Sequence, residues 1–93
     1  LKIIEKNKQE SQMTKSVFTK EYKFMLEQLV KARKKAGLSQ RELSEKLNMP
    51  SSFVGKYELG ERRLDIIEVL QIAMVLNINT SRLIYEIEKV MKQ

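Results

Sequence analysis

The residues of this chain best suited to touch another macromolecule fall on one side of a short predicted helix at residues 51–58. Val54 and Tyr57, three residues apart, form its buried side. The opposite side carries only short or flexible polar positions: Ser51, Ser52, Gly55 and Lys56. A serine hydroxyl donates or accepts a hydrogen bond, and a lysine ammonium reaches guanine O6 and N7 or a phosphate. A rigid helix pair inserts one of its helices into a DNA major groove, so in such a pair these four positions would meet base edges.

Gly55 is the unexpected member of this set. Glycine inside a helix costs about 1 kcal/mol relative to alanine. That cost makes sense if the missing side chain permits close approach to a groove wall or to a neighbouring helix, although neutral drift would also explain it.

Catalytic and metal-binding chemistry finds little support in the residue types. The chain has neither histidine nor cysteine, so the commonest general base, thiolate ligands and disulfides are all missing. No serine or threonine has a candidate base nearby in the pattern, and no glycine-rich loop could cradle a phosphate. We predict a protein that is not an enzyme and that needs no cofactor and no metal.

The predicted reading helix needs a second helix to hold it, and the preceding residues indicate one at 40–47. Gly37 suits the left-handed position just past a helix end. Ser39 and Glu42 have the spacing of a capping box, in which each side chain bonds the backbone N–H of the other residue. Asn48-Met49-Pro50 then interrupts the pattern, because Asn tolerates a positive φ and Pro opens a helix more readily than it continues one. Two short helices at a fixed angle are the arrangement that inserts one helix into DNA.

Three further helices complete an all-α, five-helix domain at 19–93. Thr19 caps a helix that runs to about Ala36. Asp65 and Glu68 form a second capping box that opens a helix ending near Leu76, and Asn79 or Thr80 caps a last helix. Three apolar stripes define the inner faces. They are Tyr22, Met25, Leu26, Leu29, Val30 and Arg33; Ile66, Val69, Ala73 and Leu76; and Leu83, Ile84, Ile87, Val90 and Met91. Residues 1–18 show no period and are predicted to be a mobile tail or a basic arm.

The charge is unevenly distributed along the chain. The 18 Lys and Arg residues against 12 Asp and Glu give a net charge of +6, divided as +3 over residues 1–20, +4 over 21–63 and −1 over 64–93. A basic half that contains the helix pair suits a polyanion, although solubility alone also favours lysine in small proteins. No apolar run is long enough for a membrane span, so we expect a soluble, cytosolic protein without a membrane partner.

The chain resembles the lambda-repressor/Cro, or XRE, family of bacterial and phage regulators over residues 22–84. The matching pattern is Arg33…Gly37-Leu38-Ser39-Gln40…Leu43…Leu47…Val54…Tyr57-Glu58…Gly60-Glu61-Arg62-Arg63, followed by Ala73 and Leu76. The resemblance implies a lambda-repressor-like fold with a central helix-turn-helix, an Arg33–Glu58 ion pair, and a Gln40 side chain that lies by the phosphate backbone and braces the reading helix. We expect phosphate contacts from Gln40, Arg41, Arg62, Arg63 and Lys35. The chain departs from the family with Ser44 in place of Ala, Asn48 in place of Gly, and short residues at 51 and 55.

The last two predicted helices carry more apolar residues than one inner face needs. We expect a homodimer interface formed by Leu70, Met74, Leu83, Ile87, Val90 and Met91. The last helix could instead fold back on its own core. The predicted function is a sequence-specific DNA-binding regulator, a dimeric repressor that reads an inverted repeat. The alternative is an antitoxin or adaptor whose C-terminal apolar helix binds a toxin or other protein.

Overall fold

The five predicted helices are present in the computed structural model, which describes residues 19–93. They are α2 (Lys20–Lys35), α3 (Gln40–Lys46), α4 (Phe53–Leu59), α5 (Ile66–Val75) and α6 (Thr80–Met91). The described residues contain no strand, which confirms the predicted all-α class. None of their helices has the length and apolar character that a membrane span requires. The prediction of a mobile tail concerns residues that lie outside the described part.

Local side-chain caps explain where four of the five helices begin. Both predicted capping boxes are confirmed. Ser39 Oγ accepts from the Glu42 N–H at 3.0 Å, and the Glu42 carboxylate accepts from the Ser39 N–H at 2.8 Å. Asp65 and Glu68 repeat this exchange at 2.8 and 3.0 Å. Thr19 caps α2 as predicted. Each cap satisfies an N–H group that has no partner within its own helix.

The turns between helices use residues that accept a positive φ. Gly37 follows α2 with φ +74°, and Gly60 follows α4 with φ +85°. Asn48 and Asn77 take φ +58° and +61°, so asparagine closes α3 and α5 where glycine is the less strained choice. Each of these residues lets the chain leave one helix and turn toward the next.

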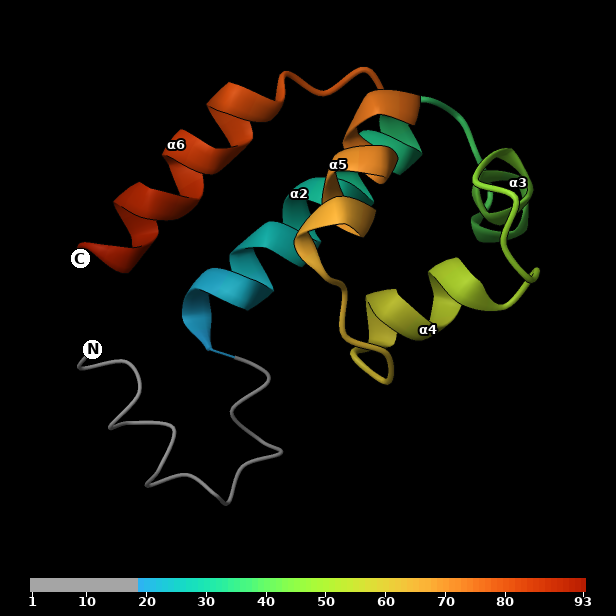
Figure 1. The fold of residues 1–93 in the computed structure, drawn as a ribbon, viewed down its shortest axis with the longest axis horizontal. Helices are drawn as coiled ribbons and strands as arrows, with labels where there is room; N and C mark the ends of the chain where they lie inside the picture. The colour runs from blue at the N-terminus through green and yellow to red at the C-terminus, as the bar shows by residue number, and fades with distance from the viewer. Residues whose placement is uncertain (1–18) are drawn as a thin grey trace.

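The helices form two packed groups around one core. Figure 1 shows α5 lying in front of α2, with α6 to one side and the α3–α4 pair to the other. α2 packs along α6, and α3 packs against α4. The fully buried centre consists of large apolar side chains from four helices, together with one serine: Leu29, Leu43, Val54, Tyr57, Ile72 and Ser44.

The structure corrects three of the predicted helix boundaries and faces. The reading helix begins at Phe53 rather than at residue 51, because Pro50 to Phe53 form a turn closed by a hydrogen bond from the Phe53 N–H to the Pro50 carbonyl at 2.9 Å. Ile66 is not an inner residue, since 60% of it is exposed and Ile72 takes the inner position. On α6 only Leu83 is buried, while Ile84 and Met91 are exposed, because the helix touches the core along a narrow stripe.

Candidate DNA interface

The four predicted reading positions line one shallow hollow on the helix pair. The hollow has a volume of about 480 Å³. It is lined by Ser51, Ser52, Gly55 and Lys56 together with Gln40, Arg41 and Leu59. Ser51, Ser52 and Lys56 are exposed, and so are Gln40 and Arg41 at the start of α3. Residues distant in sequence therefore present hydroxyl, amide and cationic groups on one side of α3 and α4.

Ser51 and Ser52 reach this surface from a turn rather than from the helix itself. Ser52 has φ −91° and ψ −1°, and its side chain makes no capping hydrogen bond to α4. Most residues at this position of a helix use an extended backbone that brings the side-chain oxygen onto the N–H groups of the first turn. Because Ser52 does not, its hydroxyl stays available to a ligand.

Ser44 on α3 supplies the missing cap from the neighbouring helix. Its hydroxyl donates to the Gln40 carbonyl at 3.0 Å and accepts from the Val54 N–H at 3.1 Å. The residue is 0% exposed. A buried backbone N–H that lacks a partner is costly, so this single hydroxyl both satisfies Val54 and ties α4 to α3. Sequence reasoning noted Ser44 only as a departure from the family pattern and did not predict this bond.

A buried ion pair connects the helix pair to α2. Arg33 Nε donates to Glu58 Oε2 at 2.8 Å, and Arg33 Nη2 donates to Oε1 at 3.0 Å, which gives the two-pronged geometry that guanidinium and carboxylate favour. Arg33 Nη1 also donates to the Leu38 carbonyl at 2.9 Å. The hydrogen bond to Glu58 raises the pKa of Arg33 above its ordinary value, despite the opposing effect of burial. This is the pair that the family pattern implies.

Gln40 extends the same network to the hollow. Its amide Nε2 donates to Glu58 Oε1 at 2.8 Å, so the carboxylate that holds Arg33 also holds Gln40. The Gln40 Oε1 atom would lie 3.2 Å from a Cβ atom added to Gly55. Gly55 therefore gives room to a side chain from the neighbouring helix, which is one of the two close approaches predicted for it. Gln40 Nε2 is engaged within the protein, whereas its backbone N–H group lies at the start of α3, where anions are favoured.

Arg62, one of the predicted phosphate contacts, makes several contacts within the protein. Its guanidinium donates to the Arg63 carbonyl and binds both oxygens of Glu68, at 3.0 and 2.8 Å. It also lies 5.0 Å from the centre of the Phe53 ring. The pKa of Glu68 is lowered by these hydrogen bonds from Arg62 and by the Asp65 N–H. Arg62 thus fastens the loop after α4 to α5, so its first role is structural.

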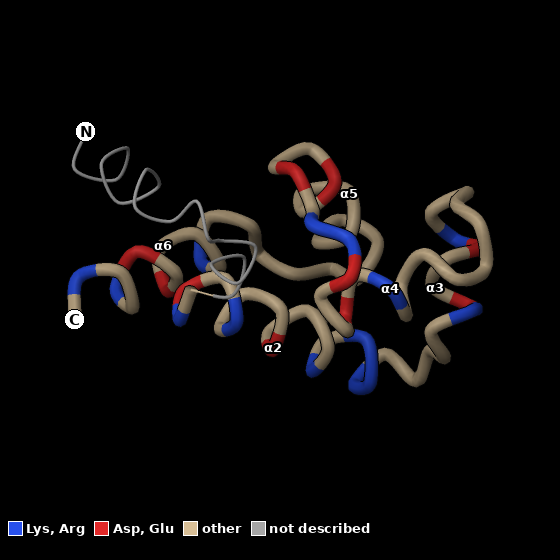
Figure 2. The backbone as a smooth tube through the Cα atoms, turned by 90° about the horizontal axis from the view of Figure 1, so that it is seen from below, with Lys and Arg blue, Asp and Glu red and all other residues tan. Residues whose placement is uncertain are grey.

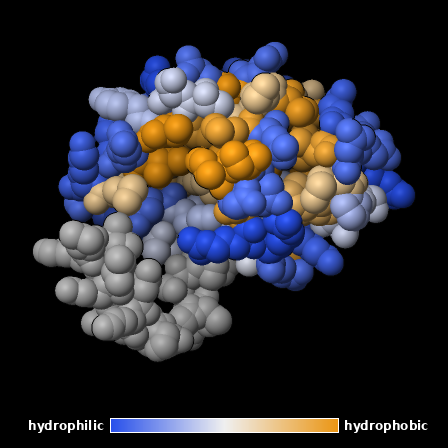
Figure 3. Space-filling model, in the orientation of Figure 1, coloured by the Kyte–Doolittle hydropathy of each residue, from blue (hydrophilic) through white to orange (hydrophobic). Residues whose placement is uncertain are grey.

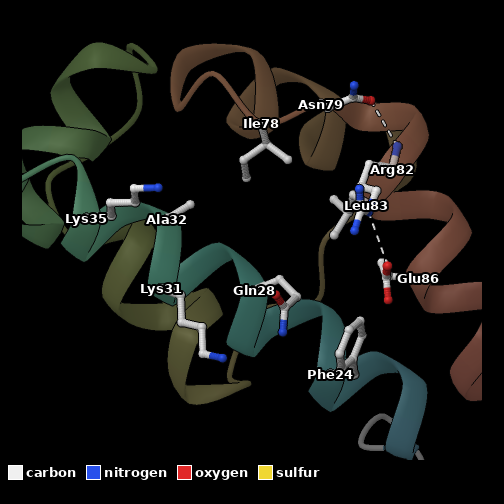
Figure 4. A pocket seen from close by; sticks show the side chains of 10 residues that line it. All are labelled: Phe24, Gln28, Lys31, Ala32, Lys35, Ile78, Asn79, Arg82, Leu83 and Glu86. Atoms are coloured by element: carbon white, nitrogen blue, oxygen red, sulfur yellow. Dashed lines mark hydrogen bonds and ion pairs between the residues drawn. The ribbon is translucent and has the colours of Figure 1, made fainter.

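Arg63 and Lys35 also lie outside the hollow. The Arg63 guanidinium stacks 4.5 Å from the centre of the Tyr22 ring, and the Tyr22 hydroxyl accepts from the Leu64 N–H at 3.0 Å. Lys35 lines a separate cleft of about 490 Å³ between α2 and α6, together with Lys31 and Arg82 (Figure 4). In that view the Arg82 side chain interacts with Glu86 across one turn of α6.

The residues predicted to form a dimer interface divide into two groups. Leu83 is only 5% exposed and Ile87 packs against the core, so α6 does fold back on its own domain. Met74 is 72% exposed, Met91 is exposed, and Leu70 and Val90 are partly exposed. Because Leu83 is buried within its own domain, its side chain is not available to the predicted dimer interface. Figure 3 shows an apolar area over α5 and the adjoining flank of α6.

Comparison with known proteins agrees with this architecture. A family model described as helix-turn-helix matches residues 29–83. The chain is similar to a solved structure described as an XRE-family like protein from Pseudomonas syringae pv. tomato str. DC3000, with 36% sequence identity and a TM-score of 0.73 over 84% of this chain and 98% of that one. No curated protein matches the chain.

The chain therefore belongs to the XRE-type helix-turn-helix family. At the level of that family it is a DNA-binding regulator.

Proposed function

We propose that this protein is a dimeric repressor that reads an inverted DNA repeat through α4 and the turn before it. The observation that carries the proposal is the hollow that gathers Ser51, Ser52, Gly55 and Lys56 beside the start of α3. Lys56 is the long side chain among the four, so we assign it the strongest base contact, with guanine as its partner. The two serines add hydrogen bonds that discriminate weakly between bases.

The support for DNA as the ligand is the rigidity of this surface as well as its charge. Ser44 and Gln40 hold α4 from α3, and Arg33 holds it from α2 through Glu58. A recognition element that is fixed before binding loses little conformational freedom when it meets its ligand. The exposed cation Arg41 and the N–H groups at the start of α3 suit the phosphates that flank such a groove contact.

A second copy of the chain is the occupant that we propose for the apolar area on α5. Ile66, Ile67 and Met74 are between 58% and 72% exposed, and Leu70 lies among them on the same side of the helix. Contiguous exposed apolar residues on a small domain mark an interface. A two-fold dimer would place two reading helices about 34 Å apart on one side of the duplex.

Selection of binding sites from a random DNA pool tests the reading function directly. We expect enrichment of an inverted repeat. Lys56→Ala should relax the preference at one base pair in each half-site, with a loss of about 1–3 kcal/mol there. Lys46→Ala, a control at the far end of α3, should leave the preference unchanged. Equal affinity for selected and scrambled duplexes would contradict sequence-specific regulation.

Sedimentation of the purified protein tests the dimer. Met74→Glu introduces a charge at an exposed position and should convert the dimer to a folded monomer, whereas Lys46→Glu on α3 should leave the dimer intact. The second candidate function is that of an antitoxin or adaptor, and the same apolar area favours it. A wild-type protein that is monomeric alone, and that forms a stoichiometric complex with the product of an adjacent gene, would support this alternative.

A further inference from the structure

The exposed side of α2, including its edge along the cleft with α6, carries five lysines. We call Lys20, Lys23, Lys31, Lys34 and Lys35 the lysine face. Successive residues of a helix are rotated by about 100°, so these five occupy an arc of about 120°. Glu27 is the one acidic residue within that arc, and all five lysines are exposed. The buried residues of α2, among them Met25, Leu29 and Arg33, occupy the opposite side.

Ion pairing within the described residues does not account for the lysine face. The four ion pairs there use Arg33, Arg62, Arg82 and Lys89. The one hydrogen bond from the lysine face joins Lys20 Nζ to the Gln93 carbonyl at 3.4 Å, and it is exposed. Within the described part of the chain, the ammonium groups of the other four lysines therefore have only solvent and salt ions to balance their charge.

The helix dipole explains only two of the five lysines. Lys34 and Lys35 lie in the last turn of α2, where a cation interacts favourably with the unpaired carbonyl groups. Lys20 and Lys23 lie at the opposite end, where the same dipole disfavours a cation. The placement of Lys23 is locally unfavourable, and the partner of Lys20 is only the exposed Gln93 carbonyl, which favours an external partner for the positive charge.

The C-terminal end of the lysine face is close in sequence to the candidate DNA interface. It lies at Lys35, five residues before Gln40 at the hollow. Figure 2 shows Lys and Arg repeatedly along the side of α2 that faces away from α5. α2 has 16 residues and is therefore about 24 Å long, a length over which a DNA duplex carries about 14 phosphate charges.

We propose that the lysine face binds the phosphate backbone of the duplex that flanks the site read by α4. This inference rests on the proposed DNA-reading function and adds a second, sequence-independent contact to it. A membrane surface is a poorer partner, because helices that lie on membranes insert an exposed apolar side and the apolar side of α2 is buried in the core. Flanking DNA matches the length, the charge and the continuity with the hollow.

The test measures affinity against salt concentration on two duplexes that contain the same selected site. One is trimmed to about 20 base pairs and the other carries long flanks of random sequence to about 50 base pairs. The substitution Lys20→Gln with Lys23→Gln should reduce the slope of log affinity against log salt on the long duplex by about 1.8 for each subunit, and so by about 3.6 for the bound dimer, at about 0.9 for each phosphate that the variant leaves without a lysine. Between about 50 and 200 mM salt this equals a loss of affinity that is about twelvefold smaller for each subunit, or about 150-fold smaller for the dimer. On the trimmed duplex the slope should stay the same.

The control variant Lys46→Gln with Lys92→Gln removes the same charge from exposed positions on α3 and after α6. It should leave both slopes unchanged. Equal slopes for the lysine-face variant and the wild type on the long duplex would overturn the proposal. So would an equal reduction in the control variant, which would indicate net charge alone. Binding to anionic vesicles of phosphatidylserine that disappears in the lysine-face variant, without any change on DNA, would also overturn it in favour of a membrane.

Failure of the proposed reading function has a different signature. If selection yields no preferred site, the reading function fails, and a scrambled duplex of about 50 base pairs then replaces the selected one. The lysine-face variant should still lower the salt slope on that duplex. An unchanged slope there would overturn the lysine-face proposal as well.

Discussion

The hydroxyl of Ser44 accepts the hydrogen bond of the Val54 amide at 3.1 Å, between two helices that are also joined by apolar packing and by the Gln40–Glu58 hydrogen bond. The bond joins α3 to the first turn of α4. It fixes the position of the very turn from which Ser51 and Ser52 project. The interhelical geometry of this motif therefore depends on one buried polar group as well as on shape.

Ser44→Ala should lower the free energy of unfolding by about 1–3 kcal/mol, because it leaves the buried Val54 N–H without a partner. Urea unfolding followed by circular dichroism measures the change. Ser81→Ala, at an exposed position on α6, should change stability by less than about 0.5 kcal/mol. Equal stability of the two variants would contradict the capping role.

Gly55→Ala should gain about 1 kcal/mol of helix propensity and lose a similar amount by displacing the Gln40 amide from Glu58. The net change in unfolding free energy should be close to zero. In the background of Gln40→Ala, which removes the crowded side chain, the same substitution should stabilise the protein by about 1 kcal/mol. Unfolding of the four members of this cycle measures the coupling, and strict additivity would show that the two residues do not interfere.

The Arg62–Glu68 pair should make stability depend on acidic pH. The pKa of Glu68 is lowered in the folded protein from its ordinary value of 4.5, chiefly by the Arg62 hydrogen bonds. A lowered folded-state pKa means that the stabilisation is fully present above pH 4.5 and is lost as pH falls through the lower folded-state value.

Thermal unfolding of the wild type, Glu68→Gln and the exposed control Glu88→Gln over this range measures the effect. Glu68→Gln should be less stable at neutral pH and should lose less stability on acidification. A Glu68→Gln curve parallel to that of the wild type would show that this carboxylate is not responsible.

The Tyr57 ring is fully buried and packs edge-on against Phe53. Its hydroxyl is buried too and has no hydrogen-bond partner in the described residues. Burial raises the pKa of this phenol far above its ordinary value. Tyr57→Phe removes the unsatisfied group and keeps the ring, so it should preserve stability or raise it by up to about 1–2 kcal/mol. Chemical unfolding tests this, and a destabilisation above about 1 kcal/mol would indicate that the hydroxyl has a partner such as a buried water.

The local features of the fold follow from the sequence alone. The capping boxes at Ser39 and Asp65, and the positive φ of Asn48 and Asn77, depend on residues within four positions of each other. Their physics is therefore contained in a short stretch of chain. The stripe on α2 was equally predictable, because one helical period places its buried residues on one side.

Only the tertiary structure decided which of several competing partners each polar group takes. Arg62 had the sequence position of a phosphate contact, yet it bonds Glu68 on the following helix. Ile66 had the apolar character of an inner residue, yet it faces outward. The side of α5 that faces the core carries Val69, Ile72, Ala73 and Leu76. Pairs such as Ser44–Val54 and Gln40–Gly55 depend on the angle between helices, which arises from packing over the whole domain and leaves no periodic signal in the chain.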